Sequence, residues 1–167
     1  GLLLWTVIQD PIECVQRGWP ILGRESRIGI STLKETFTQF IMRVLDADLK
    51  SDTIRFLFPE ILPEVPRRWN LKEIELRRGL PHDLAQHPLF ADYPALTRFP
   101  DPTFAARSLE GGGAGAHTQL EVIDDAVNEK TWNSAVNIDT AIHGIRQAFN
   151  ITRTGPQGAT LLYEAPA

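Results

Sequence analysis

The sequence predicts a mainly α protein with minor β structure, in which an irregular single core carries a proline-rich extended arm. Two observations support this prediction: the clearest apolar periodicity is helical, and eight of the twelve prolines lie within residues 59–102. A proline fixes its own φ, removes a backbone donor and disfavours helix at the preceding residue. We therefore expect a core segment over 1–58, an arm over 59–102, and a helical segment with a tail over 103–167, forming one domain plus the arm.

The chain is expected to begin with a strand and a short helix. The apolar run 2–8 is rich enough in β formers to predict a buried strand. Asp10 followed by Pro11 is a typical helix start and predicts a helix that stops before Gly18. Residues 18–30 contain four glycines or prolines and are expected to be irregular.

The clearest helix is predicted over 32–46, with Ser31 as its N-cap. Its apolar residues recur at helical spacing and form one continuous face. We expect this face to be buried, which would make the helix the centre of the core. The face consists of Leu33, Phe37, Phe40, Ile41, Val44 and Leu45.

Aromatic and aliphatic residues are spread through the arm, so it has too much apolar surface for a disordered linker. The arm is expected to lie extended across its own domain or across a neighbouring protein. One small helix is predicted inside it, with Asn70 as N-cap, Glu73 at the third position, and Gly79 after the last turn.

The last third of the chain is predicted to be helical with a final strand. Helix is expected from Phe104 to Glu110, and again over 118–131 and 138–149, with a glycine-rich hinge over 111–116 and a strand over 159–163. The helix over 118–131 is expected to bury Leu120, Ile123 and Val127. Gly144 inside the last helix predicts that a neighbour approaches closely there.

The composition is that of an ordinary globular protein, with 43% hydrophobic and 23% charged residues. A net charge of −4 disfavours a general nucleic-acid or anionic-membrane binder, and no apolar run is long enough to span a bilayer. The single cysteine, Cys14, excludes an intrachain disulfide and favours a reducing compartment or a virion over secretion. Because the chain starts with Gly1 rather than methionine, we expect it to be a matured or trimmed piece of something longer.

The residue types that bind metals gather in one place, the segment from His82 to His87. Asp83 and His87 are four residues apart, as on one helical face, and Asp92 follows downstream. The segment lies between two prolines and is too short for a closed ligand shell, so we predict that no metal binds there. These residues, with Cys14 in the first turns of a helix, are the candidates for a hydrolase cleft, but no histidine is near Cys14 in the sequence.

A basic stretch over residues 67–78 holds five cations beside Trp69 and is a candidate contact for RNA phosphates and a stacked base. Charge pairing at helix ends accounts for most of these cations. The glycine run over 111–116 lacks the Gly-Lys-Ser/Thr ending of a P-loop and is better described as a hinge.

The leading hypothesis from the sequence is a structural or interaction subunit of a larger assembly, such as a viral capsid component or an accessory subunit of an organellar complex. Its expected partners are other protein subunits, and nucleic acid is not favoured. The alternatives are a small enzyme, such as a hydrolase, with a His/Asp/Cys cleft, and an RNA-contacting subunit. No catalytic, cofactor-binding or metal-binding residue is predicted, and an enzyme is the less favoured class.

Overall fold

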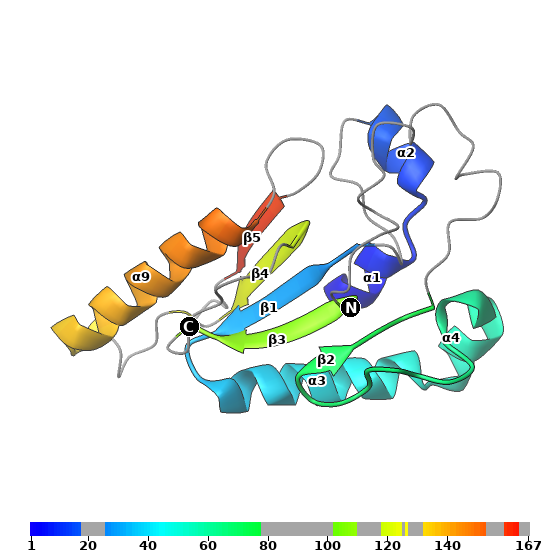
Figure 1. Ribbon diagram of the computed structural model, residues 1–167, viewed down its shortest axis with the longest axis horizontal. Coiled ribbons are helices and arrows are strands. Elements are labelled where there is room, and N and C mark those ends of the chain that lie inside the picture. Colours follow the sequence, from blue (N-terminus) through cyan, green and yellow to red (C-terminus); the bar gives the residue numbers. More distant parts are fainter. Residues whose placement is uncertain are drawn as a thin grey trace.

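The protein is an α/β domain in which helices cover both faces of a central sheet (Figure 1). The computed structural model describes residues 1–17, 26–77, 102–109, 118–124, 126, 132–152 and 159–163. The predicted mainly α fold class is therefore wrong, because one sheet takes strands from the beginning, the middle and the end of the chain.

The sheet has five strands in the order β2-β3-β1-β4-β5. The pairs β1–β3, β1–β4 and β4–β5 are parallel, and the two-residue strand β2 is antiparallel to β3. The strands are β1 (Ile28–Thr32), β2 (Glu73–Ile74), β3 (Phe104–Ser108), β4 (Leu120–Asp124) and β5 (Ala159–Tyr163). β1 is thus central, with β3 on one side and β4 on the other.

Helices of the N-terminal half lie on one face of this sheet, and the last helix lies on the other (Figure 1). Met42 and Leu45 of α3 share one core cluster with Ile28 of β1, whereas Ala148 of α9 shares a second cluster with Ile123 of β4. The helices are α1 (Leu2–Val7), α2 (Pro11–Gln16), α3 (Glu35–Leu49), α4 (Asp52–Leu57) and α9 (Ala135–Ile151), with the 3-10 turn η1 (Pro59–Ile61).

Two predicted helices are strands instead. The helix expected from Phe104 to Glu110 is β3, and the start of the helix expected over 118–131 is β4. Leu120 and Ile123 have helical spacing, but in β4 they point to opposite faces of the sheet and enter different core clusters. Because helices cover both faces of the sheet, both sides of this strand are buried and its apolar residues do not have to alternate with polar ones. The expected positions of Val127 and the 111–116 hinge lie outside the described residues.

The first predicted strand is a helix, and the irregular stretch ends in a strand. Residues 2–7 form α1, whose buried residues Thr6 and Val7 belong to its last turn. Ile28, Gly29 and Ile30 were expected in a loop but form β1, the central strand. The short helix after Asp10 is confirmed as α2, and the Asp10 carboxylate accepts a hydrogen bond from the Ile12 amide.

The core helix exists as α3, but its predicted start is wrong and only part of its predicted face, including Leu33 and Leu45, is buried. Ser31 lies in β1 and not at a helix cap, because the chain leaves the sheet only after Thr32. The residues of α3 that face the sheet are Thr38, Met42, Leu45 and Leu49. Of the face predicted from the sequence, Phe37, Phe40 and Val44 are exposed. The helix therefore has apolar side chains in two directions.

The described part of the proline-rich segment folds onto the core of its own chain, which is one of the two placements expected for the arm. Ile61, Ile74 and Leu76 are buried in the main core cluster, and the Arg77 amide donates to the Ile61 carbonyl over 2.8 Å. The helix predicted after Asn70 is a tight turn that leads into β2. The rest of the segment, residues 78–101, lies outside the description.

The C-terminal elements agree better with the prediction. The helix expected over 138–149 is α9, with Ser134 as N-cap, and the strand expected over 159–163 is β5. A Cβ atom at Gly144 would lie 2.7 Å from the Cβ of Leu109, so the predicted close approach is confirmed. This glycine lets α9 lie directly against the end of β3.

Candidate functional site

The residues proposed for a hydrolase cleft are not brought together within the described part of the chain. His82, Asp83, His87 and Asp92 lie outside the description. Cys14 is buried in the main core cluster, with 1% of its surface exposed, as a small apolar core residue would be. Among the described residues, no three His, Cys, Asp or Glu side chains are grouped as a metal site would require.

The aromatic residue of the basic stretch is engaged by α3. The indole N–H of Trp69 donates to the Asp46 carboxylate, and the Lys50 ammonium lies 5.5 Å from the centre of the ring. Lys50 also pairs with Asp46 over 2.7 Å. Burial acts to raise the pKa of Asp46, but hydrogen bonds from Lys50 and Trp69 together with the charge of Lys50 outweigh it and lower that pKa. Trp69 therefore fastens the chain before β2 to α3, which leaves it poorly suited to stack on a base.

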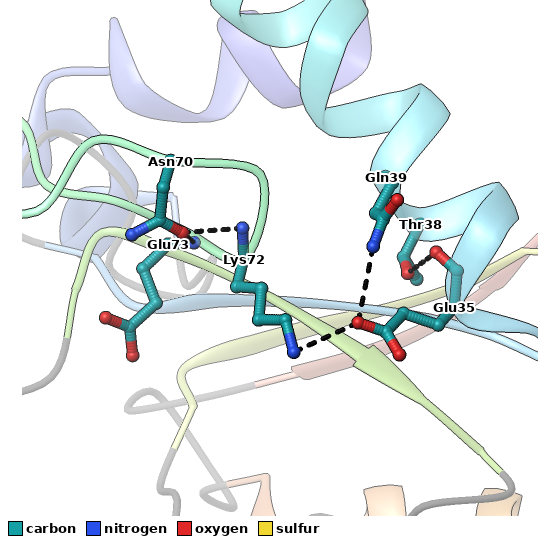
Figure 2. A network of polar contacts seen from close by, with 6 residues as sticks. All are labelled: Glu35, Thr38, Gln39, Asn70, Lys72 and Glu73. Carbon is teal, nitrogen blue, oxygen red and sulfur yellow. Dashed lines mark hydrogen bonds and ion pairs between the residues drawn. The ribbon is translucent and has the colours of Figure 1, made fainter.

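A polar network fastens the turn before β2 to the start of α3 (Figure 2). The Lys72 ammonium pairs with the Glu35 carboxylate over 3.0 Å, and the Gln39 amide donates to the same carboxylate over 3.3 Å. The Asn70 carboxamide oxygen accepts from the Lys72 and Glu73 amides, which shapes the turn. Lys72 lowers the pKa of Glu35, first by hydrogen bonding and then by its charge. The network borders a cavity of about 230 Å³, but its charges already satisfy one another.

A fully buried carboxylate lies on the face of the sheet that α9 partly covers. Glu121 of β4 accepts hydrogen bonds from Ser31 of β1 over 2.5 Å and from Thr118 over 3.1 Å. The Arg107 guanidinium of β3 is 3.6 Å from the same carboxylate. Glu121 pairs in register with Gly29, whose missing side chain makes room: a Cβ there would lie 1.7 Å from a Glu121 oxygen. The carboxylate thus links three strands through their side chains.

The buried Glu121 has a shifted pKa. Desolvation raises the pKa, while Arg107, Ser31 and Thr118 pull it down less strongly. A perturbed carboxylate often marks an active site, but only where it faces a cleft. Glu121 has no exposed surface, so we assign it to holding the strands together rather than to chemistry on a substrate.

The sheet has a topological switch point between β1 and β4. The connection from β1 to β3 runs through α3 on one face, and the connection from β4 to β5 runs through α9 on the other. In open α/β sheets, ligands bind outside the carboxyl ends of the strands at such a point. We call the carboxyl ends of β1 and β4 the switch-point edge.

Two of the charged residues that the structure describes, Asp124 and Lys34, lie at the switch-point edge. Ser31 of β1 pairs with Ile123 of β4, so Thr32 and Asp124 end these strands at the same level. Asp124 is half-buried, and Lys34, two residues after β1, is exposed. The backbone there is held firmly, because the Leu109 amide donates to the Thr32 carbonyl over 2.9 Å.

Asp124 also lines an apolar groove of about 390 Å³. The groove runs between α1 and α3 over the strands β1 and β4, and Asp48 of α3 contributes a second carboxylate. The Gly1 amino group also lines the groove and lies 3.7 Å from the Asp48 carboxylate. The apolar lining is Leu2, Leu3, Leu4, Ile30, Phe40, Ile41, Val44, Leu45 and Val122.

Sequence reasoning missed the switch-point edge. The signal was present as the buried run Leu120–Ile123 directly followed by Asp124 and Asp125. Once this run is placed in a parallel strand, an acidic pair at its carboxyl end indicates a ligand site. When it is placed in a helix, as predicted, the same residues are an unremarkable solvent-facing pair.

No family model matches the chain, and no curated protein matches it either. Every helix in the described part of the chain is too short or too polar to cross a membrane. The function must therefore be inferred from the switch-point edge and the surfaces around it.

Proposed function

We propose that this chain binds a nucleotide together with Mg²⁺ at the switch-point edge. The observation behind the proposal is the position of Asp124, a half-buried carboxylate that ends a central parallel strand where the connections diverge. Phosphate-bearing ligands are common at such edges. P-loop NTPases use a carboxylate of the same kind to hold Mg²⁺.

The two charged residues have complementary parts in this proposal. Asp124 would hold the metal, with Asp125 next to it in the sequence, because hard cations prefer carboxylate oxygens. When bound, Mg²⁺ would neutralise phosphate charge and make the phosphoryl group easier to attack. These 167 residues contain no Gly-x-x-x-x-Gly-Lys-Ser/Thr motif, which would supply a phosphate-binding lysine. We assign the phosphate to Lys34 instead, because Lys34 is exposed and follows the end of β1 by two residues.

Calorimetric titration of the chain with ATP and with ADP, in Mg²⁺ and in EDTA, tests the proposal. Binding should require Mg²⁺, and Asp124→Asn should weaken it at least about tenfold, as loss of a metal-site group does. The matched control is Asp139→Asn, which changes an exposed carboxylate on α9 and should leave affinity unchanged. Phosphate release in the same samples would reveal whether the bound nucleotide is hydrolysed.

The proposal fails if neither nucleotide binds to the folded chain in Mg²⁺. It also fails if the Asp124 and Asp139 variants bind equally well. Binding that persists in EDTA would remove the metal from the proposal.

The second candidate function is that of an interaction subunit in a larger multi-protein assembly. The observation that favours it is the exposure of large apolar side chains on α3 and α4, where Phe56 is 84% exposed and Phe40 is 64% exposed. Contiguous exposed apolar surface commonly marks an interface with another protein. Sedimentation of the chain in its native source would test this candidate, because an assembly subunit should sediment far faster than an 18.7 kDa protein.

A further inference from the structure

The second core cluster is built from residues that adjoin the switch-point edge. Leu109 directly follows β3, Ile123 directly precedes Asp124 in β4, and Ala126 follows that carboxylate by two residues. Ala148 and Ile145 of α9 complete the cluster. The side chains next to both sides of the edge are therefore packed together, and α9 is the helix that covers them.

Three small residues of α9, Ala141, Gly144 and Ala148, are buried and follow one another at steps of three and four residues. Small side chains at a contact let a helix approach its neighbour closely. At Gly144, an added Cβ atom would lie 2.7 Å from the Leu109 Cβ and 3.0 Å from the Leu109 carbonyl oxygen. Any side chain at position 144 must therefore displace Leu109 or move α9.

Leu109 is in turn joined to the end of β1. Its amide donates to the carbonyl of Thr32, the last residue of β1, over 2.9 Å. The Thr32 hydroxyl donates to the Lys34 carbonyl over 2.6 Å, and the Ser108 hydroxyl donates to the Leu33 carbonyl over 3.1 Å. Hydrogen bonds thus fix the backbone from Thr32 to Lys34, and the end of β3 supplies part of them. A shift of Leu109 is therefore passed to the backbone that carries Lys34.

We propose that Gly144 is a positioning residue for the switch-point edge, because its contact with Leu109 sets the backbone from which Lys34 reaches the phosphate. This inference rests on the proposed nucleotide binding and deepens it, since it makes α9 the element that regulates that site. Coupling between two parts of a protein acts in both directions. A nucleotide held by Lys34 should therefore also perturb Leu109 and Gly144.

Calorimetric titration of folded variants with ATP in Mg²⁺ tests the proposal. Gly144→Ala adds one carbon atom beside Leu109 and should weaken ATP binding by about 2- to 30-fold, as changes at residues that act on a site through others do. Ala141→Gly is the matched control, because it loosens another buried position of α9 without adding an atom beside Leu109. Its affinity should be unchanged. A merely structural Gly144 would change the urea midpoint of its variant and leave the affinity for ATP unchanged.

The route through Lys34 is tested in a Lys34→Ala background. Lys34 is exposed, so its truncation should leave the fold intact. If Gly144 acts by placing the Lys34 ammonium, Gly144→Ala should cause little further loss of affinity when that ammonium is absent, since two changes on one route are not additive.

A measurement on the original chain does not depend on the folding of any variant. Addition of ATP and Mg²⁺ to the isotope-labelled chain should shift the amide NMR resonances of Leu109 and Gly144. Val136, which is 74% exposed in the first turn of α9, should keep its resonance.

The proposal is overturned if Gly144→Ala binds ATP as the original chain does, or if Ala141→Gly weakens binding as much. It is also overturned if the loss is the same without Lys34, or if the Leu109 and Gly144 resonances stay in place while ATP binds. In these cases the nucleotide site stands, because ATP still binds to the original chain. Failure of ATP to bind to the original chain overturns the proposed function and this inference together.

Discussion

The two faces of the central sheet are both buried, yet they are built from different chemistry. The face under α3 is apolar, with Ile28, Ile30, Phe104 and Val122 in the main core cluster. The opposite face carries a buried carboxylate held by hydroxyl groups and a guanidinium. The first face gains stability from the removal of apolar surface from water. The second depends on the pairing of buried polar groups with one another, with Arg107 reaching Glu121 only as an ion pair over 3.6 Å, and a change in any partner leaves another buried group unpaired.

The largest effect is expected on the apolar face. Phe104→Ala should lower the free energy of unfolding by roughly 3 to 5 kcal/mol, because Phe104 has no exposed surface and its truncation leaves a cavity. Phe56→Ala is the matched control, since Phe56 is almost fully exposed, and it should cost no more than about 0.5 kcal/mol. Urea unfolding measures both. Equal losses would mean that the apolar face is not the centre of stability.

The next largest loss of stability is expected on the sheet-facing side of α3 rather than on its exposed apolar side. Met42→Ala should cost about 2 to 5 kcal/mol, because Met42 has no exposed surface and lies against the sheet. Phe37→Ala should cost less than about 1 kcal/mol in the isolated chain, although sequence periodicity placed Phe37 in the core. Urea unfolding again decides. A larger loss for Phe37 would restore the buried face that the sequence predicted.

These comparisons show how far the sequence could predict the fold. α2, α9 and β5 were predicted because their signals are local: a proline at a helix start, a helical repeat, and a short apolar run before the tail. The position of α3 was found, but only part of its buried face, because the helix is apolar in two directions and the sequence cannot rank them.

The central strands were not predicted because they are buried on both faces of the sheet and are held by residues far apart in the sequence. In β4, Leu120 and Val122 point to the apolar face while Glu121 points to the polar one. In the sequence, a glutamate among apolar residues is also the pattern of an amphipathic helix, and only the pairing of Glu121 with Gly29 distinguishes the two. That pairing joins residues far apart in the sequence, so no local signal reports it. Asp124 was missed as a candidate site residue for the same reason.

On the polar face, Gly29→Ala should cost about 1 to 3 kcal/mol or more, as overpacking does. The new Cβ would overlap the Glu121 carboxylate. In a Glu121→Ser background the clash is removed and a hydroxyl remains, so Gly29→Ala should then be nearly neutral. Urea unfolding of the two single variants and the double variant gives the coupling energy. Additive losses would show that Gly29 is not kept for the carboxylate.

The smallest effect is a pH dependence that belongs to the polar face alone. Burial raises the pKa of Glu121 above its ordinary value of 4.5, against the opposing effects of Arg107, Ser31 and Thr118. The folded state therefore holds this proton more tightly than the unfolded state. The contribution of Glu121 to stability is fully present below pH 4.5 and is lost as the pH rises through the folded pKa.

Comparison with Glu121→Gln isolates the pH dependence that is due to Glu121, because the amide of the variant cannot titrate. Carboxylates with a lowered pKa, such as Glu35 and Asp46, are present in both proteins, so their contributions cancel. The difference in unfolding free energy, original minus variant, should fall as the pH rises, with a slope of at most about 1.4 kcal/mol per pH unit for one proton. The same experiment on Glu35→Gln should show the opposite slope, since Lys72 lowers the pKa of Glu35. If the difference in unfolding free energy for Glu121 rises with pH, attraction to Arg107 has a larger effect on the pKa of Glu121 than burial has. The charge pair would then stabilise the polar face.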